Sequence, residues 1–158
     1  DLHAVDLDAP LVGGFIEDGR DLAVDDIAAG QGVQEIIFEQ TGEYAKLVRF
    51  PGGSSNTVSR FNPGIMTRLT NDLNDMGYAY FDWNVSAADT ASDATRYTVI
   101  ENFKESVPKH DYSVVLQHDT NAFSVDAVEE ILSWGIKNGY SFRALNLTSP
   151  AVHHSVAN

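Results

Sequence analysis

The stretch "YSVVLQ", residues 112–117, is a short and nearly uninterrupted run of apolar residues. A strand that faces solvent on one side alternates apolar and polar residues, whereas a strand covered on both faces is apolar throughout. The stretch therefore predicts a buried strand in a sheet whose two faces are both covered by other elements.

Segments with a strand pattern and segments with a helical pattern alternate on both sides of this run. We expect strands at 45–49, 78–83 and 141–145, and helices at 24–40, at 65–76, within 93–107, and from Ser124 as N-cap to 137–139. This alternation is typical of parallel βαβ units, and neither a linker nor a repeat interrupts it. The sequence therefore predicts an α/β fold with mostly parallel strands in a single domain over residues 1–158. Residues 1–23 show no clear pattern.

The composition restricts the class of protein. The 158 residues are 43% apolar without a long apolar run, which predicts a soluble domain without a membrane span. No charged-then-apolar leader is present, so we expect an export signal to be already removed or absent. Ten Lys and Arg residues against 23 acidic residues give a charge of −13, which disfavours nucleic acid as a partner. The absence of cysteine excludes disulfides and thiolate chemistry.

Polar or aromatic side chains follow three of the expected strands. Arg49 follows the first, Asp82 and Trp83 end the second, and His118 follows the third. Taken singly, Arg49 is as easily a surface ion-pair partner and Trp83 a core residue. Because the carboxyl ends of parallel strands carry the functional loops, we expect the four side chains to line one shared pocket, with His118 positioned for proton transfer.

The glycine-rich turn after Arg49 fits the same interpretation. In "KLVRFPGGSSN", residues 46–56, the strand ends in a charge and the chain then turns on Gly52 and Gly53. Residues without side chains allow a substrate to approach the backbone closely. An ordinary surface turn is the alternative.

Three motifs and the closing segment carry a family resemblance. "RFPGGSSN" (49–56), "FDWNVSAAD" (81–89) and "VVLQHDT" (114–120) resemble the third, fourth and fifth motifs of polysaccharide deacetylases, carbohydrate esterase family 4. The segment "YSFRALNLTSPAVHHSVAN" (140–158) is similar to the tail of Gram-positive members. The resemblance covers about residues 24–158, and it implies a partial (β/α) barrel of the polysaccharide deacetylase type.

The resemblance implies roles for six residues. Arg49 resembles the arginine that orients the catalytic base, and the Gly52 N–H falls where the family places an oxyanion donor, normally from a tyrosine. Asp82 matches the aspartate that pairs with the catalytic histidine, and His118 matches that histidine, the general acid. Trp83 resembles the groove-lining aromatic residue and Leu116 the lip of the acetate pocket.

The first two motifs of the family, which supply the base and the metal ligands, have no full counterpart. "FIEDG" at 15–19 only faintly resembles the first. Aligned with the second, "HAVDLD" at 3–8 offers His3 as one metal ligand, but Leu7 replaces the other histidine. An ordinary N-terminal histidine is the alternative for His3. Hydrolytic zinc needs about three protein ligands. We therefore expect the complete domain to bind the metal, and this chain alone to be inactive.

Two functional readings follow. The first is the larger part of a zinc-dependent, secreted bacterial deacetylase that removes N- or O-linked acetyl groups from cell-wall polysaccharide. The second is an inactive, deacetylase-like module that still binds glycan around Trp83 and Arg49. An incomplete barrel exposes sheet edge, so we also expect self-association or a covering partner.

Overall fold

The computed structural model describes residues 3–6, for which only the backbone is considered, and residues 34–158. The "FIEDG" motif, Leu7 and the first part of the expected helix 24–40 lie outside these residues. The end of that helix is described: residues 34–41 are helical, and the helix ends before Gly42, whose φ is +76°.

The chain divides into two compact units. The first consists of Asp1–Ala9 and Trp83–Asn146, and the second of Pro10–Asp82 and Leu147–Asn158. The single domain over residues 1–158 stays a prediction.

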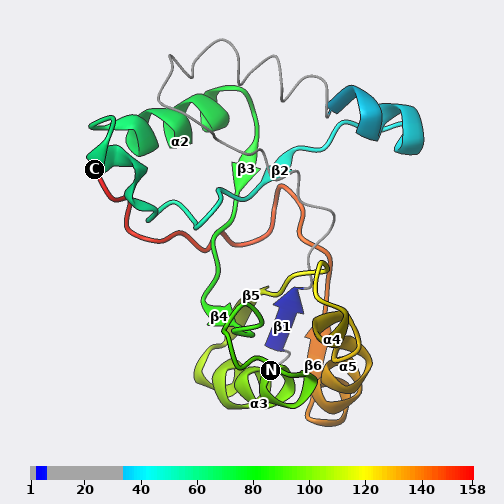
Figure 1. Ribbon diagram of the computed structural model, residues 1–158. Coiled ribbons are helices and arrows are strands. Elements are labelled where there is room, and N and C mark those ends of the chain that lie inside the picture. Colours follow the sequence, from blue (N-terminus) through cyan, green and yellow to red (C-terminus); the bar gives the residue numbers. More distant parts are fainter. Residues whose placement is uncertain (1–2, 7–33) are drawn as a thin grey trace. The chain divides into compact units, whose positions relative to one another are not determined.

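The first unit contains a four-stranded parallel sheet in the order β4-β5-β1-β6 (Figure 1). Its strands are β1 (His3–Asp6), β4 (Val85–Ser86), β5 (Tyr112–Leu116) and β6 (Tyr140–Phe142). Ala4 pairs with Tyr112 on one side and with Ser141 on the other. The strand expected at 112–117 is confirmed as β5, which pairs with a strand on each side.

Helices of the first unit bury an apolar cluster against one face of this sheet. They are α3 (Arg96–Ser106), η2 (Val107–Lys109), α4 (Ala122–Val125) and α5 (Val128–Lys137). Val85 and Val115, which are paired in register, pack with Phe103 of α3 and Ile131 of α5. Side chains alternate along a strand, so the next pair, Ser86 and Leu116, points to the opposite face.

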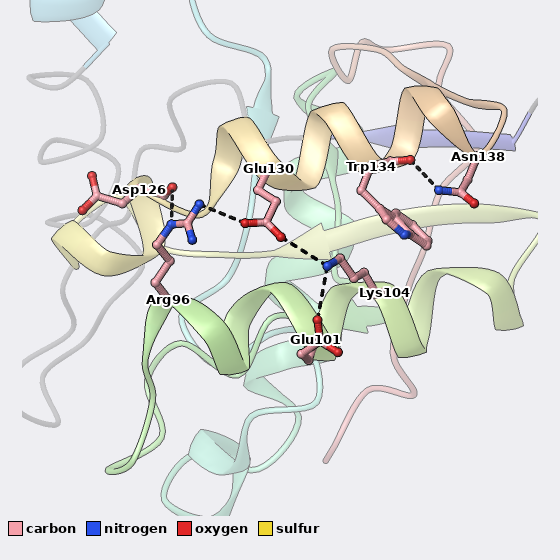
Figure 2. A network of polar contacts seen from close by, with 7 residues as sticks. All are labelled: Arg96, Glu101, Lys104, Asp126, Glu130, Trp134 and Asn138. Carbon is pink, nitrogen blue, oxygen red and sulfur yellow. Dashed lines mark hydrogen bonds and ion pairs between the residues drawn. The ribbon is translucent and has the colours of Figure 1, made fainter.

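Exposed ion pairs join α3 to α5 above this cluster (Figure 2). Glu130 accepts from Arg96 Nη2 at 3.0 Å and from Lys104 Nζ at 3.3 Å, and Lys104 also contacts Glu101 at 3.2 Å. Arg96 Nε donates to the carbonyl of Asp126 at 3.0 Å. Exposed pairs contribute little to stability, so the apolar cluster beneath them holds the two helices together.

Besides the helical residues 34–41, the described part of the second unit contains a two-stranded parallel sheet and the helix α2. Its elements are β2 (Leu47–Val48), η1 (Thr57–Arg60), α2 (Ile65–Asp75) and β3 (Ala79–Tyr80). Leu47 pairs with Ala79 and Val48 with Tyr80. The helix expected at 65–76 is confirmed, and Gly77 follows it with φ +74°.

Parallel strands combined with helices confirm the predicted α/β class, but two element predictions were wrong. The stretch 78–83 holds only β3, and a separate strand, β4, begins at Val85. Ser124 does not cap the following helix: it lies inside α4, and its hydroxyl donates to Asp89 at 2.7 Å. An N-cap residue has a non-helical backbone and precedes the first helical residue, whereas Ser124 is already the third residue of α4. Within residues 34–158 no helix is long and apolar enough to cross a membrane.

Candidate active site

The strongest polar constellation of the first unit is a histidine–aspartate pair. Nδ1 of His118 lies 2.9 Å from Oδ1 of Asp89. Asp89 is only 2% exposed, whereas the His118 side chain is 39% exposed. One partner is therefore buried and fixed, and the other is accessible to a substrate.

Three segments supply this pair and its supports. His118 follows β5, and its backbone N–H also donates to Oδ2 of Asp89 at 2.6 Å. Ser124 of α4 donates to the same oxygen at 2.7 Å. Asn121 Nδ2 donates to the Asp89 carbonyl at 3.1 Å. The carboxylate thus ties the end of β5 to α4.

The backbone that brings Asp89 to this position adopts an uncommon conformation. Ala88, which precedes it, has φ +52°, the left-handed region that a residue with a Cβ avoids. The Ala88 N–H donates to the hydroxyl of Ser86 at 3.1 Å. The strained turn directly after β4 aims the carboxylate at His118, and strain of this kind is typical of functional sites.

The contacts define the protonation state of the pair. Burial alone raises the pKa of Asp89, but hydrogen bonds from Ser124 and His118 outweigh it and hold the pKa below its usual value. An ionised carboxylate only accepts, so Nδ1 of His118 carries a hydrogen. Nε2 is then the ring atom that can deliver a proton to a substrate.

A second buried carboxylate, Asp82, belongs to the second unit. It is fully buried, and it accepts from the Ser54 N–H at 2.7 Å, the Ser54 hydroxyl at 2.5 Å and the His154 N–H at 2.7 Å. All three donors lie in the second unit. The predicted pairing of Asp82 with His118, a residue of the first unit, stays a prediction.

Arg49 and Gly52 also lie in the second unit, directly after β2. Arg49 is 7% exposed and donates from Nε to the carbonyl of Phe81 at 3.2 Å. The Gly53 N–H donates to the Phe50 carbonyl at 2.8 Å, and Gly52 has φ +70°. A proline followed by a glycine with positive φ is typical of a type II turn, so residues 50–53 form one.

The remaining predicted residues lie in the first unit. Trp83 is half-buried just before β4, and Leu116 is half-buried at the end of β5. His3 belongs to β1, where its backbone is in register with Tyr140, and its side chain is outside the description. Because Arg49, Gly52 and Asp82 belong to the other unit, the single shared pocket stays a prediction.

The part of the chain that the structure describes contains no group of three or more His, Cys, Asp or Glu side chains that could hold a metal ion. The described residues therefore do not supply a zinc site by themselves.

Sequence reasoning missed Asp89 and Ser124. Asp89 is the last residue of the motif "FDWNVSAAD", whereas the resemblance implied the pairing role for Asp82, the first acidic residue of that motif. The signal that could have found it is an acidic residue at the end of a second strand, β4, because parallel neighbours deliver their following residues to the same edge.

Comparisons with known proteins point to one family of proteins. No family model matches the chain. The catalytic domain of a peptidoglycan N-acetylglucosamine deacetylase from Eubacterium rectale is 49% identical, with a TM-score of 0.78 over 81% of this chain and 59% of that one. The polysaccharide deacetylase Bc1974 from Bacillus cereus is 27% identical, with a TM-score of 0.63 over 84% of this chain and 62% of its own.

A curated sequence gives the same result. A peptidoglycan-N-acetylglucosamine deacetylase from Bacillus cereus is 30% identical over 116 residues, which are 70% of this chain and 40% of that protein. The chain spans 42% and 40% of the lengths of the two curated relatives that it matches. The similarity therefore covers part of a catalytic domain.

Proposed function

Because the chain belongs to the polysaccharide deacetylases of carbohydrate esterase family 4, we propose that it forms the larger part of the catalytic domain of a bacterial deacetylase. The complete domain hydrolyses acetyl groups on cell-wall glycan. The relatives named for peptidoglycan N-acetylglucosamine support N-acetyl groups as the target and a location outside the cell.

The observation that carries this proposal is the Asp89–His118 pair. Hydrolysis of an acetamide breaks the carbon–nitrogen bond, adds the hydroxyl of water to the acetyl carbon and leaves an amine that must gain a proton. Protonated His118 donates that proton from Nε2, and Asp89 stabilises the cation from the other side of the ring. The buried carboxylate therefore takes the role that the resemblance suggested for Asp82.

The nucleophilic half of the reaction is left to groups outside the described residues. The family resemblance implies a divalent metal, with zinc as the expected ion and His3 as one expected ligand. The described residues do not form a ligand set for such an ion.

The other roles follow the resemblance. We propose that Arg49 orients the catalytic base and that the Gly52 N–H stabilises the oxyanion. Trp83 stacks on the sugar, and Leu116 contacts the acetyl methyl group. The position of Leu116 on the sheet face opposite the helices supports its role, since that face is the interior of the proposed barrel.

The test is acetate release from N-acetylglucosamine oligomers by the purified full-length protein, with zinc supplied. His118→Ala should reduce the rate by about 10²- to 10⁴-fold, the usual contribution of a general acid. His110→Ala is the matched control, because His110 follows η2 and takes no part in the pair.

Sugar binding without acetate release by the zinc-loaded protein would instead favour the glycan-binding module. Equal rates for the His118 and His110 variants would contradict the assignment of the general acid.

A further inference from the structure

We propose that His154 is a positioning residue that fixes the glycine-rich loop of residues 49–56 through Ser55 and through Asp82. This inference rests on the proposed function for its catalytic consequence, but its structural basis lies entirely in the second unit. In the sequence, the closing segment that contains both histidines shows only a family resemblance.

Short-range hydrogen bonds shape the loop but do not attach it to the rest of the unit. The Gly53 N–H donates to the Phe50 carbonyl at 2.8 Å, and Asn56 Nδ2 donates to the carbonyls of Pro51 and Gly53 at 3.2 and 3.0 Å. Ser54 and Ser55 lie between these bonds and contact the tail of the chain.

The tail supplies an anchor from a distant part of the sequence. Ser55 Oγ lies 3.0 Å from His154 Nδ1, across 99 residues of sequence. The Ser54 hydroxyl lies 3.3 Å from the His154 carbonyl oxygen. Both serines thus contact the same tail residue, one at its ring and one at its backbone.

Asp82 fastens the two segments at their backbones. Its carboxylate accepts from the N–H of Ser54 and from the N–H of His154, both at 2.7 Å. The Asp82 N–H donates to the carbonyl of Val152 at 2.8 Å. Burial of the carboxylate strengthens these charge-assisted bonds.

His153 holds the tail against β3. Its ring stacks on Tyr80 with centroids 3.9 Å apart and an angle of 8° between the planes. Its Nε2 lies 2.9 Å from the Tyr80 carbonyl, which can only accept, so Nε2 carries a hydrogen. Residues 152–154, which we call the clasp, are thus fixed to β3 and are a rigid base for the Ser55 contact.

The clasp matters for the reaction because Arg49 and Gly52 precede Ser54 by a few residues. A backbone donor to an oxyanion is effective only when it is held in place before the reaction. Loosening the anchor should therefore weaken catalysis without removing any group that touches the substrate.

The experiment combines amide hydrogen exchange of residues 49–56 with acetate release, both on the full-length protein. His154→Ala removes the ring contact, whereas His154→Asn keeps a polar atom near the position of Nδ1. We expect His154→Ala to speed exchange of the loop and lower kcat/KM by about three- to tenfold, the effect of one hydrogen bond. His154→Asn should restore much of both.

Ser55→Ala tests the same contact from the other side, in case the histidine variant fails to fold. The double variant should be no worse than either single variant, because both remove one interaction. Ser155→Ala, an exposed tail neighbour, is the control that should change neither readout.

Unchanged loop exchange in both His154→Ala and Ser55→Ala would overturn the clasp. Faster exchange with unchanged kcat/KM would overturn its positioning role. Faster exchange in a protein that releases no acetate in any form would support the clasp and overturn the proposed function instead.

Discussion

Asp89 in the first unit and Asp82 in the second are both buried carboxylates that accept hydrogen bonds from a serine hydroxyl and a backbone N–H. The third donor differs. Asp89 receives it from the imidazole of His118, and Asp82 receives it from the backbone of His154.

The third donor decides what each carboxylate can do. A ring nitrogen can gain or lose its hydrogen, so the Asp89 contact can change with the protonation of its partner. A peptide N–H cannot, so Asp82 is tied to a permanent set of donors. The same side chain is therefore suited to proton transfer in one unit and to fixing a loop in the other.

The largest expected effect comes from Asp89→Asn. The new amide can donate to His118 Nδ1, so the hydrogen bond survives but holds the ring in the other tautomer. We expect the fold to remain and acetate release to fall by about 10²-fold or more.

Kinetics of the purified variant at a series of pH values, together with its circular dichroism spectrum, check this expectation. A wild-type rate and pH profile would show that the contact in the first unit has no catalytic role.

Asp82→Asn should mainly lower the stability of the fold, in contrast to Asp89→Asn, which should mainly lower the rate. The Ser54 N–H and the His154 N–H point at different carboxylate oxygens, so whichever oxygen becomes an amide meets a fixed donor. We expect a loss of about 1–3 kcal/mol in the free energy of unfolding, the cost of a buried unpaired group. Urea denaturation gives the free energy of unfolding of both asparagine variants. Equal losses of stability in the two variants would contradict the difference between the two carboxylates.

The positive-φ residues give a paired test of backbone strain. Gly52→Ala places a Cβ 3.3 Å from Asn56 Cβ at φ +70°, and it should cost about 1–2 kcal/mol. Ala88→Gly relieves the left-handed conformation before Asp89 and should gain about 0.5–1 kcal/mol, since glycine also costs unfolded-state entropy. Thermal unfolding of both variants should shift in opposite directions, and a common direction would refute the strain at Ala88.

Acid should act on the first unit through Asp89. The pKa of this carboxyl is lower in the folded state than its ordinary value of 3.8, because the bonds from Ser124 and His118 outweigh burial. Its stabilising contribution is therefore complete above that ordinary value and disappears as pH falls through the lower folded-state pKa. The unfolding free energy of Asp89→Asn should depend less steeply on pH in this range, and parallel curves for variant and wild type would contradict the argument.

The smallest effect is expected from an exposed carboxylate of the first unit. Glu130→Gln removes the partner of Arg96 and Lys104 (Figure 2). Any loss of stability should vanish at high salt, since ions screen exposed charges. Denaturation at low and high salt measures it. A salt-independent loss would mean that the network contributes more than surface charge.

Strong local patterns allowed much of the fold to be predicted. The apolar run at 112–117 became β5, and the helical spacing after Gly64 became α2. The boundary between β3 and β4 was not predicted. The aromatic run 78–83 continues beyond the residues of β3 that pair with β2, and β4 pairs with β5 instead. A sequence pattern shows which side chains are apolar. It does not show where a strand ends, because that depends on the neighbouring strand with which it pairs.

The candidate site was predictable in its residue types and less so in its contacts. His118 followed from its place after a buried strand. Asp89 was missed because its approach to His118 depends on the left-handed Ala88, a conformation that an alanine gives no reason to expect. The tail contacts of Asp82 span about 70 residues of sequence, beyond the reach of any local pattern.

The contact between Ser54 and His154 also has a temporal side, because it joins residues 100 positions apart. A chain leaves the ribosome from its amino end, at about 5–20 residues per second. The glycine-rich turn is therefore synthesised many seconds before the histidine that fastens it. During that interval the turn lacks its anchor. A bulky group fused on the carboxyl side of His154 would therefore impair a loop that was synthesised much earlier.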